Sequence, residues 1–539
     1  MKYGFIIDNR KCIGCHACTT ACKSEHNVAV GVNRTWVKQV EKGQFPHTRR
    51  LFSVMRCNHC TDAPCVEICP VEALFIREDG IVDFNNERCI ACKSCMQACP
   101  YDALYIDPET STAAKCNYCA HRVDVGLEPA CVNVCPEHAI ISGDMEDPDS
   151  EIFELLNREQ VTVRKAEKGT QPNLYYINGD SASLTPTETD RSDQYFWSSQ
   201  SSGVGHFARH ADKMAFSNGD VVQAVMEANG QSATAGEVAG KGATRSIDLM
   251  LGKSRRVYDS PDKGVLWGWE VSGYVMTKAI AAGAFLLLFL GGLFGYAPET
   301  LTATAGLAAG LVFLGLTGVL LIMDLDQPKR FLYVLLRPQW KSWLVRGGYT
   351  ISVYGGLLTL LLVGQFLDLG AFTGVINWIT AVFAILTAVY TAFLFAQAKG
   401  RDFWQSPTLA LHMLVHSVMA GAALYGLLTV VEAAPDGWMG MIEVVFITSI
   451  AVNLVILTVE LVTPHPTTDS KRVVKMITSG RFRNRFWFGS VLIGNMVPLA
   501  IALLMPGGLA FAVASLLVII GIYQTEKIWV EAPQRVPLS

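Results

Sequence analysis

The sequence predicts a protein of two parts, an α+β domain rich in cysteine followed by an all-α bundle of eight transmembrane helices. The first part is indicated by the cysteines, all 16 of which lie between Cys12 and Cys135 of a 539-residue chain. The second is indicated by eight apolar runs after Trp267, each long enough to cross a bilayer. A mean hydropathy of +0.29 with only 17% charged residues agrees with partial membrane insertion. The net charge of −4, without a basic stripe, gives no indication of nucleic-acid binding.

The cysteines fall into four groups of four. The first and third groups have the spacing C-x2-C-x2-C-x3-C, the second has one wider gap, and the fourth has eleven residues between its second and third cysteines. A proline follows the last cysteine of groups two, three and four and turns the chain away. The groups, in chain order, are Cys12, Cys15, Cys18 and Cys22; Cys57, Cys60, Cys65 and Cys69; Cys89, Cys92, Cys95 and Cys99; and Cys116, Cys119, Cys131 and Cys135.

This spacing is typical of ligands for [4Fe-4S] clusters. In bacterial ferredoxins the same run of cysteines holds one cluster with three thiolates and gives its fourth to a neighbouring cluster. Zinc sites use closed sets of four ligands in more widely separated pairs, and disulfides are disfavoured in a reducing cytosol. The stretch "MKYGFIIDNRKC" lacks the features of a secretory signal, so we expect the domain to stay in the cytosol unless a partner carries it out. Sixteen ligands then predict four [4Fe-4S] clusters in an α+β ferredoxin-like iron–sulfur domain.

The whole arrangement resembles the four-cluster subunit of the complex iron–sulfur molybdoenzymes, the dimethyl sulfoxide reductase family. The resemblance implies that groups one and four share two clusters and that groups two and three share the other two. Some relatives replace the second cysteine of group three and hold a three-iron cluster, whereas this chain has Cys92 there. The implied ligand sets are Cys12, Cys15, Cys18 with Cys135; Cys116, Cys119, Cys131 with Cys22; Cys57, Cys60, Cys65 with Cys99; and Cys89, Cys92, Cys95 with Cys69.

The middle of the chain is rich in Ser, Thr, Gly and Asp, which predicts a polar linker. Its segment "AGEVAGKGAT" does not match a phosphate-binding loop, because Ala235 stands where the first glycine is required. We therefore predict an iron–sulfur domain over residues 1–182, a linker over 183–262 and a membrane domain over 263–539.

The apolar runs and the loops between them predict both the spans and their orientation. An even number of spans places both ends of this half on the same side. Loops on the side of the cysteine groups carry thirteen Lys and Arg residues between Lys329 and Arg485, whereas opposite loops such as "GYAPET" carry none. By the positive-inside rule the cysteine groups face the cytoplasm, and we expect the protein in a bacterial inner membrane. The predicted spans lie near 271–294, 301–323, 347–367, 373–396, 408–431, 441–463, 486–505 and 508–528.

Three segments of the membrane half resemble the NrfD, or polysulfide reductase membrane-subunit, family. They are "MDLDQPKRFLYVLLRPQWKSWLVRGGY", "VYTAFLFAQAKGRDFWQSP" and "GRFRNRFWFGSVLIGNMVPL". The resemblance covers most of residues 267–528 and indicates a fusion of two subunits that are usually separate. It implies a quinone, ubiquinone or menaquinone, bound near the iron–sulfur side, generally without haem. His412 and His416 lie four residues apart on one helix and face the same way, which disfavours a haem held between them.

A quinone site fed by the clusters requires polar side chains in the half of the membrane nearest to them. Glu270, Tyr274 and Lys278 recur every four residues and share one face of the first span. Ionisable groups inside a bilayer are costly and are functional candidates by default. The alternative is that Glu270 and Asp324 simply reach the interface and that Lys278 snorkels. The candidates for quinone or proton binding are Glu270, Tyr274, Lys278, Asp324, Tyr390, His412, His416 and Glu460, with Tyr390 favoured by its match to the family's "YT" segment.

The sequence thus predicts an electron-transfer and membrane-anchor subunit of a multisubunit oxidoreductase. Electrons would pass between a separate molybdopterin catalytic subunit, four clusters and a membrane quinone, and the cytoplasmic orientation favours flow toward quinone. We expect no substrate-side catalytic site on this chain. Two alternatives stay open: a subunit of a quinol-oxidising respiratory assembly resembling alternative complex III, and a redox-linked ion transporter.

Overall fold

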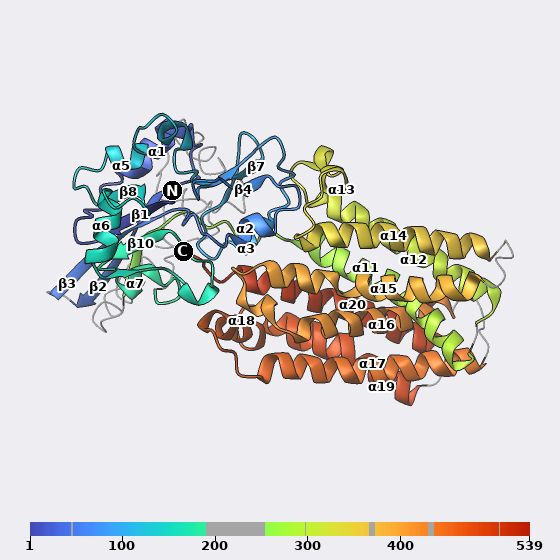
Figure 1. Cartoon of the computed structure of the whole chain (residues 1–539). Helices are drawn as coiled ribbons and strands as arrows, with labels where there is room; N and C mark the ends of the chain where they lie inside the picture. Colours follow the sequence, from blue (N-terminus) through green and yellow to red (C-terminus); the bar gives the residue numbers. More distant parts are fainter. Residues whose placement is uncertain (45–46, 190–253, 297, 366–371, 430–435, 506) are drawn as a thin grey trace, which may run out of the picture.

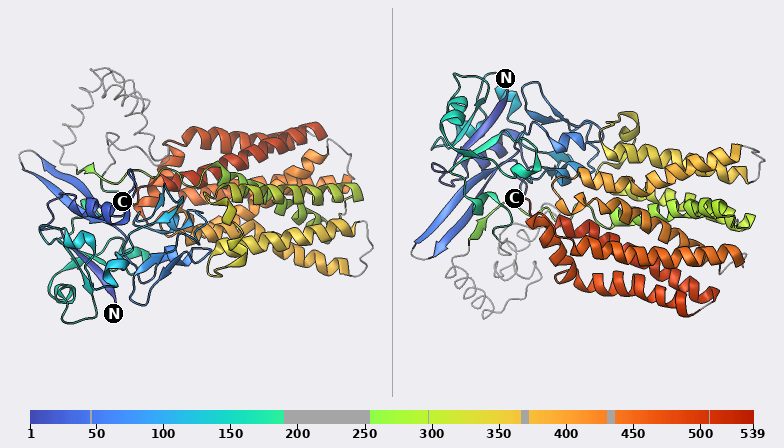
Figure 2. Two further views of the ribbon diagram at one scale, coloured as in Figure 1. Left: turned by 90° about the horizontal axis from the view of Figure 1, so that it is seen from above. Right: turned by 60° about the horizontal axis from the view of Figure 1, so that its bottom comes forward.

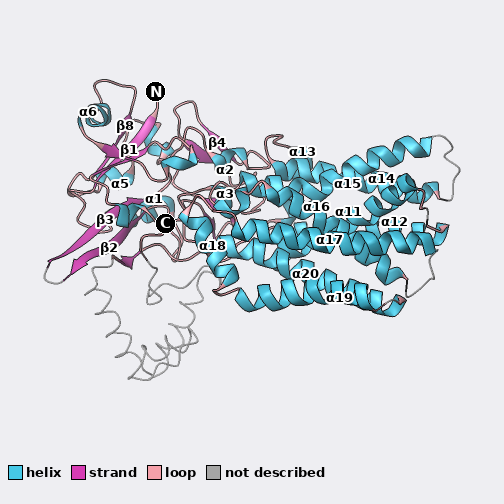
Figure 3. Ribbon diagram, turned by 90° about the horizontal axis from the view of Figure 1, so that it is seen from below, coloured by secondary structure: helices cyan, strands magenta, loops and turns pink. Residues whose placement is uncertain are grey.

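The computed structural model describes the chain apart from residues 45–46, 190–253, 297, 366–371, 430–435 and 506. A cysteine-rich domain lies at one end of a long bundle of helices (Figure 1), and the described strands are confined to that domain (Figure 3). The predicted fold class, an α+β domain joined to an all-α bundle, is confirmed. Most of the predicted linker, residues 190–253, lies outside the described residues, and the domain boundaries stay a prediction.

A four-stranded sheet forms the centre of the cysteine-rich domain, in the order β8-β1-β10-β9. Its central strand β1 pairs antiparallel with β8 and parallel with β10. Side chains alternate along β1, so that Phe5 and Ile7 enter one buried cluster and Ile6 enters another beneath helix α6. The bounds are β1 Tyr3–Asp8, β8 Ile140–Asp144, β9 Val161–Thr162, β10 Leu174–Ile177 and α6 Glu151–Arg158.

The cysteines lie on loops and on short helices, between small hairpins. These helices are too short to be stable alone, so their geometry depends on what the loops pack around. The bounds are α1 Ala17–His26, α2 Pro64–Glu67, β4 Leu74–Ile76, β5 Val82–Phe84, α3 Ser94–Ala98, β6 Tyr105–Asp107, β7 Thr112–Ala114, α4 Ala120–Val123 and α5 Ala130–Asn133.

A long hairpin of β2 (Trp36–Gln44) and β3 (His47–Met55) extends from the domain, away from the bundle (Figure 1). The described end of the predicted linker adds the strand β11 (Arg255–Tyr258) to β2 in antiparallel orientation. Trp36 Nε1 donates a hydrogen bond of 2.7 Å to Asp259, just after β11. This part of the linker is therefore packed into the domain against β2, which also contacts α7 (Ser181–Leu184).

In the described residues, eight segments are long and apolar enough to span a membrane, as predicted. They run side by side along the bundle (Figure 2). The short helices α13 (Tyr333–Leu336) and α18 (Thr468–Thr478) lie between spans on the side of the cysteine-rich domain. The spans are α11 Trp269–Phe294, α12 Thr300–Met323, α14 Trp343–Gly364, α15 Phe372–Gln397, α16 Thr408–Leu428, α17 Asp436–Val462, η5 Arg485–Met496 continued by α19 Val497–Leu504, and α20 Gly508–Gln534.

The spans pack as two groups of four, α11, α12, α14 and α15 in the first half and α16, α17, η5–α19 and α20 in the second. The halves meet mainly where α11 crosses α16, and glycines allow this close approach. A Cβ on Gly283 would lie 1.9 Å from the carbonyl oxygen of Ser417, and one on Gly421 would lie 2.4 Å from that of Gly283. The seventh span is a π-helix up to Met496, two residues before Pro498, whose ring clashes with the preceding turn of a regular α-helix.

Polar contacts fix the cysteine-rich domain to the bundle. Gln97 on α3 donates to Gln534 at 2.6 Å and accepts from the buried Arg401 at 2.9 Å. Arg330 donates to the carbonyl oxygens of Asn86 and Cys89 at 2.7 and 2.9 Å. The third cysteine group is thus held directly against the membrane half.

Candidate functional site

All four cysteine groups share one backbone feature. The residue before the second cysteine of each group has a positive φ angle: Gly14, His59, Ala91 and Tyr118. A left-handed conformation is costly for residues other than glycine. Because it recurs in all four groups although their side chains differ, the four groups share one structural requirement at this position. The turn directs backbone N–H groups toward the preceding cysteine, as in the contacts of 3.5 Å from His59 N to Cys57 Sγ and 3.4 Å from Ala91 N to Cys89 Sγ.

Two of the implied ligand sets each line one small cavity. Cys12, Cys15 and Cys18 do so with Cys135 from the far end of the cysteine region. Cys89, Cys92 and Cys95 surround a second cavity with Cys69 from group two. In both cases three cysteines of one group meet the last cysteine of another.

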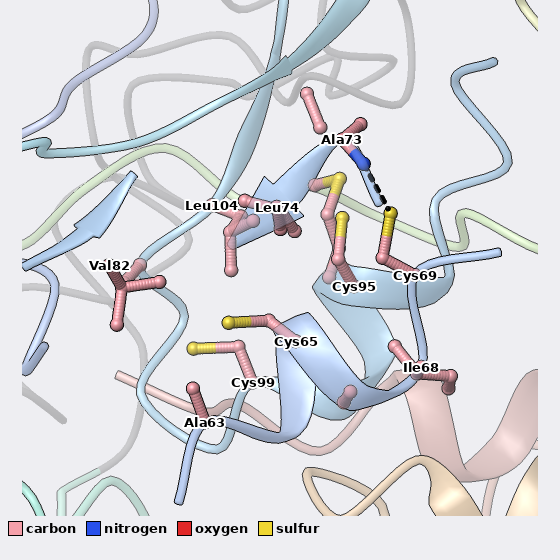
Figure 4. Close-up of a cluster of buried hydrophobic side chains, with 14 of the residues drawn as sticks. Ala63, Cys65, Ile68, Cys69, Ala73, Leu74, Val82, Cys95, Cys99 and Leu104 are labelled. Atoms are coloured by element: carbon pink, nitrogen blue, oxygen red, sulfur yellow. Dashed lines mark hydrogen bonds between the residues drawn. The ribbon is translucent and has the colours of Figure 1, made fainter. Parts of the chain in front are cut away.

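The other two sets also come together. Burial raises the pKa of the Cys22 thiol, and the neighbouring thiols Cys116, Cys131 and Cys119 raise it further. In the same way, Cys99, Cys57 and Cys60 add to the effect of burial on the Cys65 thiol and raise its pKa. Figure 4 shows the sulfurs of Cys65 and Cys99 side by side, with those of Cys69 and Cys95 together near Ala73. The N–H of Ala73 donates to Cys69 Sγ at 3.2 Å.

The four sets lie at different distances from the membrane half. Cys15 is exposed and Cys12 and Cys135 are half-buried, whereas the other thirteen cysteines are buried. This accessible set lies beside α1 and α5, far from the bundle, whereas α2 and α3 lie next to it (Figure 1). Groups two and three therefore lie next to the membrane half, and the accessible set formed by groups one and four lies far from it.

A cavity of about 220 Å³ lies at the junction of the two parts. Its walls are mostly apolar, with a few polar side chains, which is typical of small-molecule sites. Ile90, Cys92 and Ser94 of the third cysteine group form one wall, and α11, α12, α14 and α15 form the others. Tyr274, Asp324 and Tyr390 of the predicted candidates line it.

The cysteine-rich domain bonds directly to the rim of this cavity. Trp267 Nε1 donates to the carbonyl oxygen of Cys92 at 3.1 Å. Lys93 Nζ donates to the carbonyl oxygen of Asp324 at 3.0 Å and pairs with Asp326 at 3.1 Å. Burial raises the pKa of the Asp324 carboxyl to about 7, with Lys93 opposing this and Glu270 adding to it. Glu270 is half-buried near Asp324 but does not line the cavity.

Lys278 lies behind Tyr390 rather than in the cavity. Its Nζ donates to Thr391 Oγ1 at 2.7 Å and to the carbonyl oxygen of Ala388 at 3.0 Å, and lies 4.6 Å from the centre of the Tyr390 ring. Tyr390 also packs closely on Gly347, where a Cβ would lie 2.3 Å from the ring. Lys278 therefore holds the Tyr390 ring from behind and is too buried, at 1% exposure, to snorkel.

The remaining three candidates form a second site in the other half of the bundle. His412 Nδ1 lies 2.9 Å from the Glu460 carboxylate, which also accepts from Thr408 and Trp529 at 2.9 and 3.1 Å. His416 Nδ1 lies 2.6 Å from Glu526, whose carboxylate is 3.9 Å from His412 Nε2. The Nε2 atoms of both histidines are buried without a hydrogen-bond partner among the described residues.

Glu526 was missed by the sequence analysis. It lies within the predicted eighth span, in "YQTEKIW", and an acid inside a span is itself a signal of function. Glu526 is 2% exposed, and its charge acts on Lys278 as well as on the histidines. It therefore connects the buried network of the second half to the residues that support the cavity in the first.

Comparison with known families matches both parts of the chain. The family model described as a 4Fe-4S dicluster domain matches residues 11–74, and a second model of the same description matches residues 48–145. The model described as polysulphide reductase, NrfD, matches residues 260–528. The resemblances that the sequence suggested are confirmed, including the fusion of a ferredoxin-like part with an NrfD part.

Similar proteins match the cysteine-rich part. The B subunit of the tetrathionate reductase of Salmonella typhimurium is 46% identical over 189 residues, which cover 34% of this chain and 76% of the relative. The B subunit of the polysulfide reductase of Wolinella succinogenes is 42% identical over 181 residues, 33% of this chain and 94% of the relative. Protein NrfC of Escherichia coli is 41% identical over 180 residues, 33% of this chain and 81% of the relative. The chain belongs to this family of 4Fe-4S electron-transfer subunits and carries its own NrfD membrane anchor.

Proposed function

We propose that this protein passes electrons between a separate molybdopterin catalytic subunit and a membrane quinone through four [4Fe-4S] clusters, with quinone as the acceptor. The observation that carries the proposal is the mostly apolar cavity that lies against Cys92 of the third cysteine group and is large enough to suit a small molecule. The clusters supply one-electron transfer, and the residues of the chain hold them in a row from the exposed Cys15 to the membrane. The sixteen cysteines serve as ligands in the four sets given above.

The chemistry of the cavity suits a quinone headgroup. A quinone is a flat apolar ring with two carbonyl oxygens, which need hydrogen-bond donors and, on reduction, protons. Apolar walls accommodate the ring, and the Tyr274, Tyr390 and Asp324 side chains supply polar groups. Asp324, with its raised pKa, is protonated in part near neutral pH, which suits a proton donor.

The catalytic partner would dock where the first ligand set reaches the surface, around Cys12, Cys15 and Cys135. Electrons must enter there, because the set at the other end of the row faces the bundle. The similarity to iron–sulfur subunits of tetrathionate and polysulfide reductases supports a partner subunit, and the basic loops beside the cysteine-rich domain support a cytoplasmic orientation in a bacterial inner membrane.

Purification of the intact chain with its partners tests the proposal. We expect about sixteen irons per chain, a pterin-bound metal in a partner subunit, and a quinone that a photoreactive analogue displaces and labels near Tyr390. Tyr390→Phe should weaken labelling, whereas Tyr296→Phe, at an exposed position beyond the end of α11, should not. Haem-bearing partners without a pterin would favour the quinol-oxidising respiratory assembly instead.

A second candidate function, redox-linked proton transport, is favoured by the buried network of His412, His416, Glu460 and Glu526. Alternating imidazole and carboxylate groups can hold and pass a proton in a region without bulk water. Proton uptake measured in liposomes containing the whole complex tests this function. Uptake in excess of that needed for quinone reduction, lost in Glu526→Gln, would support it, and a ratio set by quinone chemistry alone would exclude it.

A further inference from the structure

Arg56 is a buried cation without a carboxylate partner in the described part of the chain. It follows β3 directly and precedes Cys57, and its side chain is 0% exposed. Nη1 lies 3.1 Å from Cys131 Sγ, and the guanidinium lies 4.5 Å from the centre of the Phe5 ring. Its Nε and Nη2 have no hydrogen-bond partner among the described residues.

A charge in such a place requires compensation. Leaving a buried guanidinium unpaired is strongly unfavourable, and a cation–π contact offsets only part of that cost. Burial alone would lower the pKa of this guanidinium, but three neighbouring thiols, those of Cys131, Cys116 and Cys18, raise it overall. The negative charge that balances Arg56 is therefore that of the cysteine sulfurs and of whatever they bind.

These sulfurs belong to two of the four ligand sets. Cys116 and Cys131 come from the set completed by Cys22, and Cys18 comes from the accessible set. Arg56 thus lies where the first two stations of the proposed electron path adjoin, and its hydrogen bond reaches the second of them.

We propose that Arg56 sets the reduction potential of the cluster held by Cys22, Cys116, Cys119 and Cys131, raising it so that this cluster accepts electrons from the surface. The inference rests on the proposed function, since it requires the cluster to be bound. One electron is added to the cluster from a low-potential donor, with no proton moved and no bond formed. A fixed positive charge and an N–H···S hydrogen bond both stabilise the added negative charge, and hydrogen bonds to the sulfurs are a known determinant of cluster potential.

A second buried cation shows why Arg56 is distinctive. Lys115 is also 0% exposed, but its Nζ donates to the main-chain carbonyl oxygens of Val82 and Cys116. Two of its three N–H donors go to the backbone, whereas Arg56 donates to the Cys131 sulfur and keeps two further N–H positions. The Lys115 charge acts mainly on Cys57 of the second cysteine group, where it opposes the rise in pKa of that thiol, whereas Arg56 bonds to Cys131 of the fourth group.

The test is a redox titration of the purified whole complex, followed by electron paramagnetic resonance of the reduced clusters. Arg56→Gln removes the charge, and Arg56→Lys keeps the charge but loses the planar fork. We expect Arg56→Gln to lower one of the reduction potentials by about 59 mV or more, which is a tenfold change in the one-electron equilibrium. Arg56→Lys should shift the same transition less. Iron is measured in every variant, so that a lost cluster is not taken for a shifted one.

Arg164→Gln is the matched control. Arg164 is a buried arginine of the same domain at 1% exposure, but it donates to the carbonyl oxygens of Leu184 and Leu538 and contacts no cysteine sulfur in the described structure. It should leave all potentials unchanged. Full iron with unshifted potentials in both Arg56 variants would overturn the inference and leave Arg56 a packing residue. Absence of [4Fe-4S] signals in the unaltered protein would instead overturn the proposed function.

Discussion

The two halves of the membrane bundle use their buried polar residues differently. In the first half, Tyr274, Asp324 and Tyr390 surround a cavity that contacts the third cysteine group. In the second half, His412, His416, Glu460 and Glu526 bond to one another, and none of them lines that cavity. A site for a ligand keeps space between its polar groups, whereas a site for a proton brings them into contact. Under the proposed function, the first half would hold the quinone beside its electron source, and the second half would hold a proton.

The largest effect on quinone reduction should follow from interrupting electron transfer to the first half of the bundle. Cys95 is buried in the set next to the cavity, so Cys95→Ala should lower quinone reduction by the whole complex to below about 1% of its original rate. Transfer from the catalytic partner to a soluble dye at the exposed Cys15 end should persist, and serves as the control. Quinone reduction that survives this change would show that electrons reach the membrane by another way.

A smaller effect should follow from disturbing the shape of the cavity alone. A Cβ on Gly347 would lie 2.3 Å from the Tyr390 ring, so the ring must move and the cavity wall that it forms must change shape. We expect Gly347→Ala to raise the KM for quinone about tenfold, in keeping with the cost of about 1–3 kcal/mol for overpacking. Gly356→Ala is the matched control on the same helix, because no atom lies within 4 Å of its added Cβ. Equal KM values for quinone in the two variants would show that the position of Tyr390 does not affect quinone binding.

A change in the second half should affect proton uptake and leave quinone reduction nearly unchanged. Glu526→Gln keeps the shape but removes the carboxylate that lies between the two histidines. We expect quinone reduction within about threefold of normal, together with a loss of any proton uptake beyond that of quinone chemistry. A KM effect as large as that of Gly347→Ala would contradict the division between the halves.

Features that depend on spacing along the chain could be predicted from the sequence. The eight spans were predicted because burial in lipid requires long apolar runs, and their observed bounds differ from the predicted ones by a few residues. The left-handed turns before Cys60 and Cys119 were not predicted, since His59 and Tyr118 are not residues that usually adopt them. The pairing of cysteines from distant groups was implied by resemblance, and spacing alone left it open.

A shared helix face predicted less well which side chains lie together at one site. Glu270, Tyr274 and Lys278 lie on one face of α11, but each step of four residues moves about 6 Å along the axis. The three side chains therefore reach the rim, the cavity and the space behind Tyr390, respectively. The role of Lys278 depends on Thr391 and Ala388 of α15. Contacts of this kind between two helices cannot be predicted from the sequence of one of them.

The smallest effect, a change of pH dependence, tests whether Asp324 supplies a proton to the cavity. Burial raises the pKa of this carboxyl to about 7, so it is protonated below pH 7 and loses its proton above. If the protonated form donates to quinone, the rate of quinone reduction should fall about tenfold between pH 6 and pH 8. Asp324→Asn cannot donate a titrating proton, so its rate should be lower at pH 6 and nearly flat over this range. Asp326→Asn is the comparison, because Asp326 does not line the cavity but its charge helps to raise the pKa of Asp324; in this variant the fall with pH should persist and move to lower pH. A fall with pH that persists unchanged in Asp324→Asn would assign the titrating group elsewhere, with the network of the second half as the next place to look.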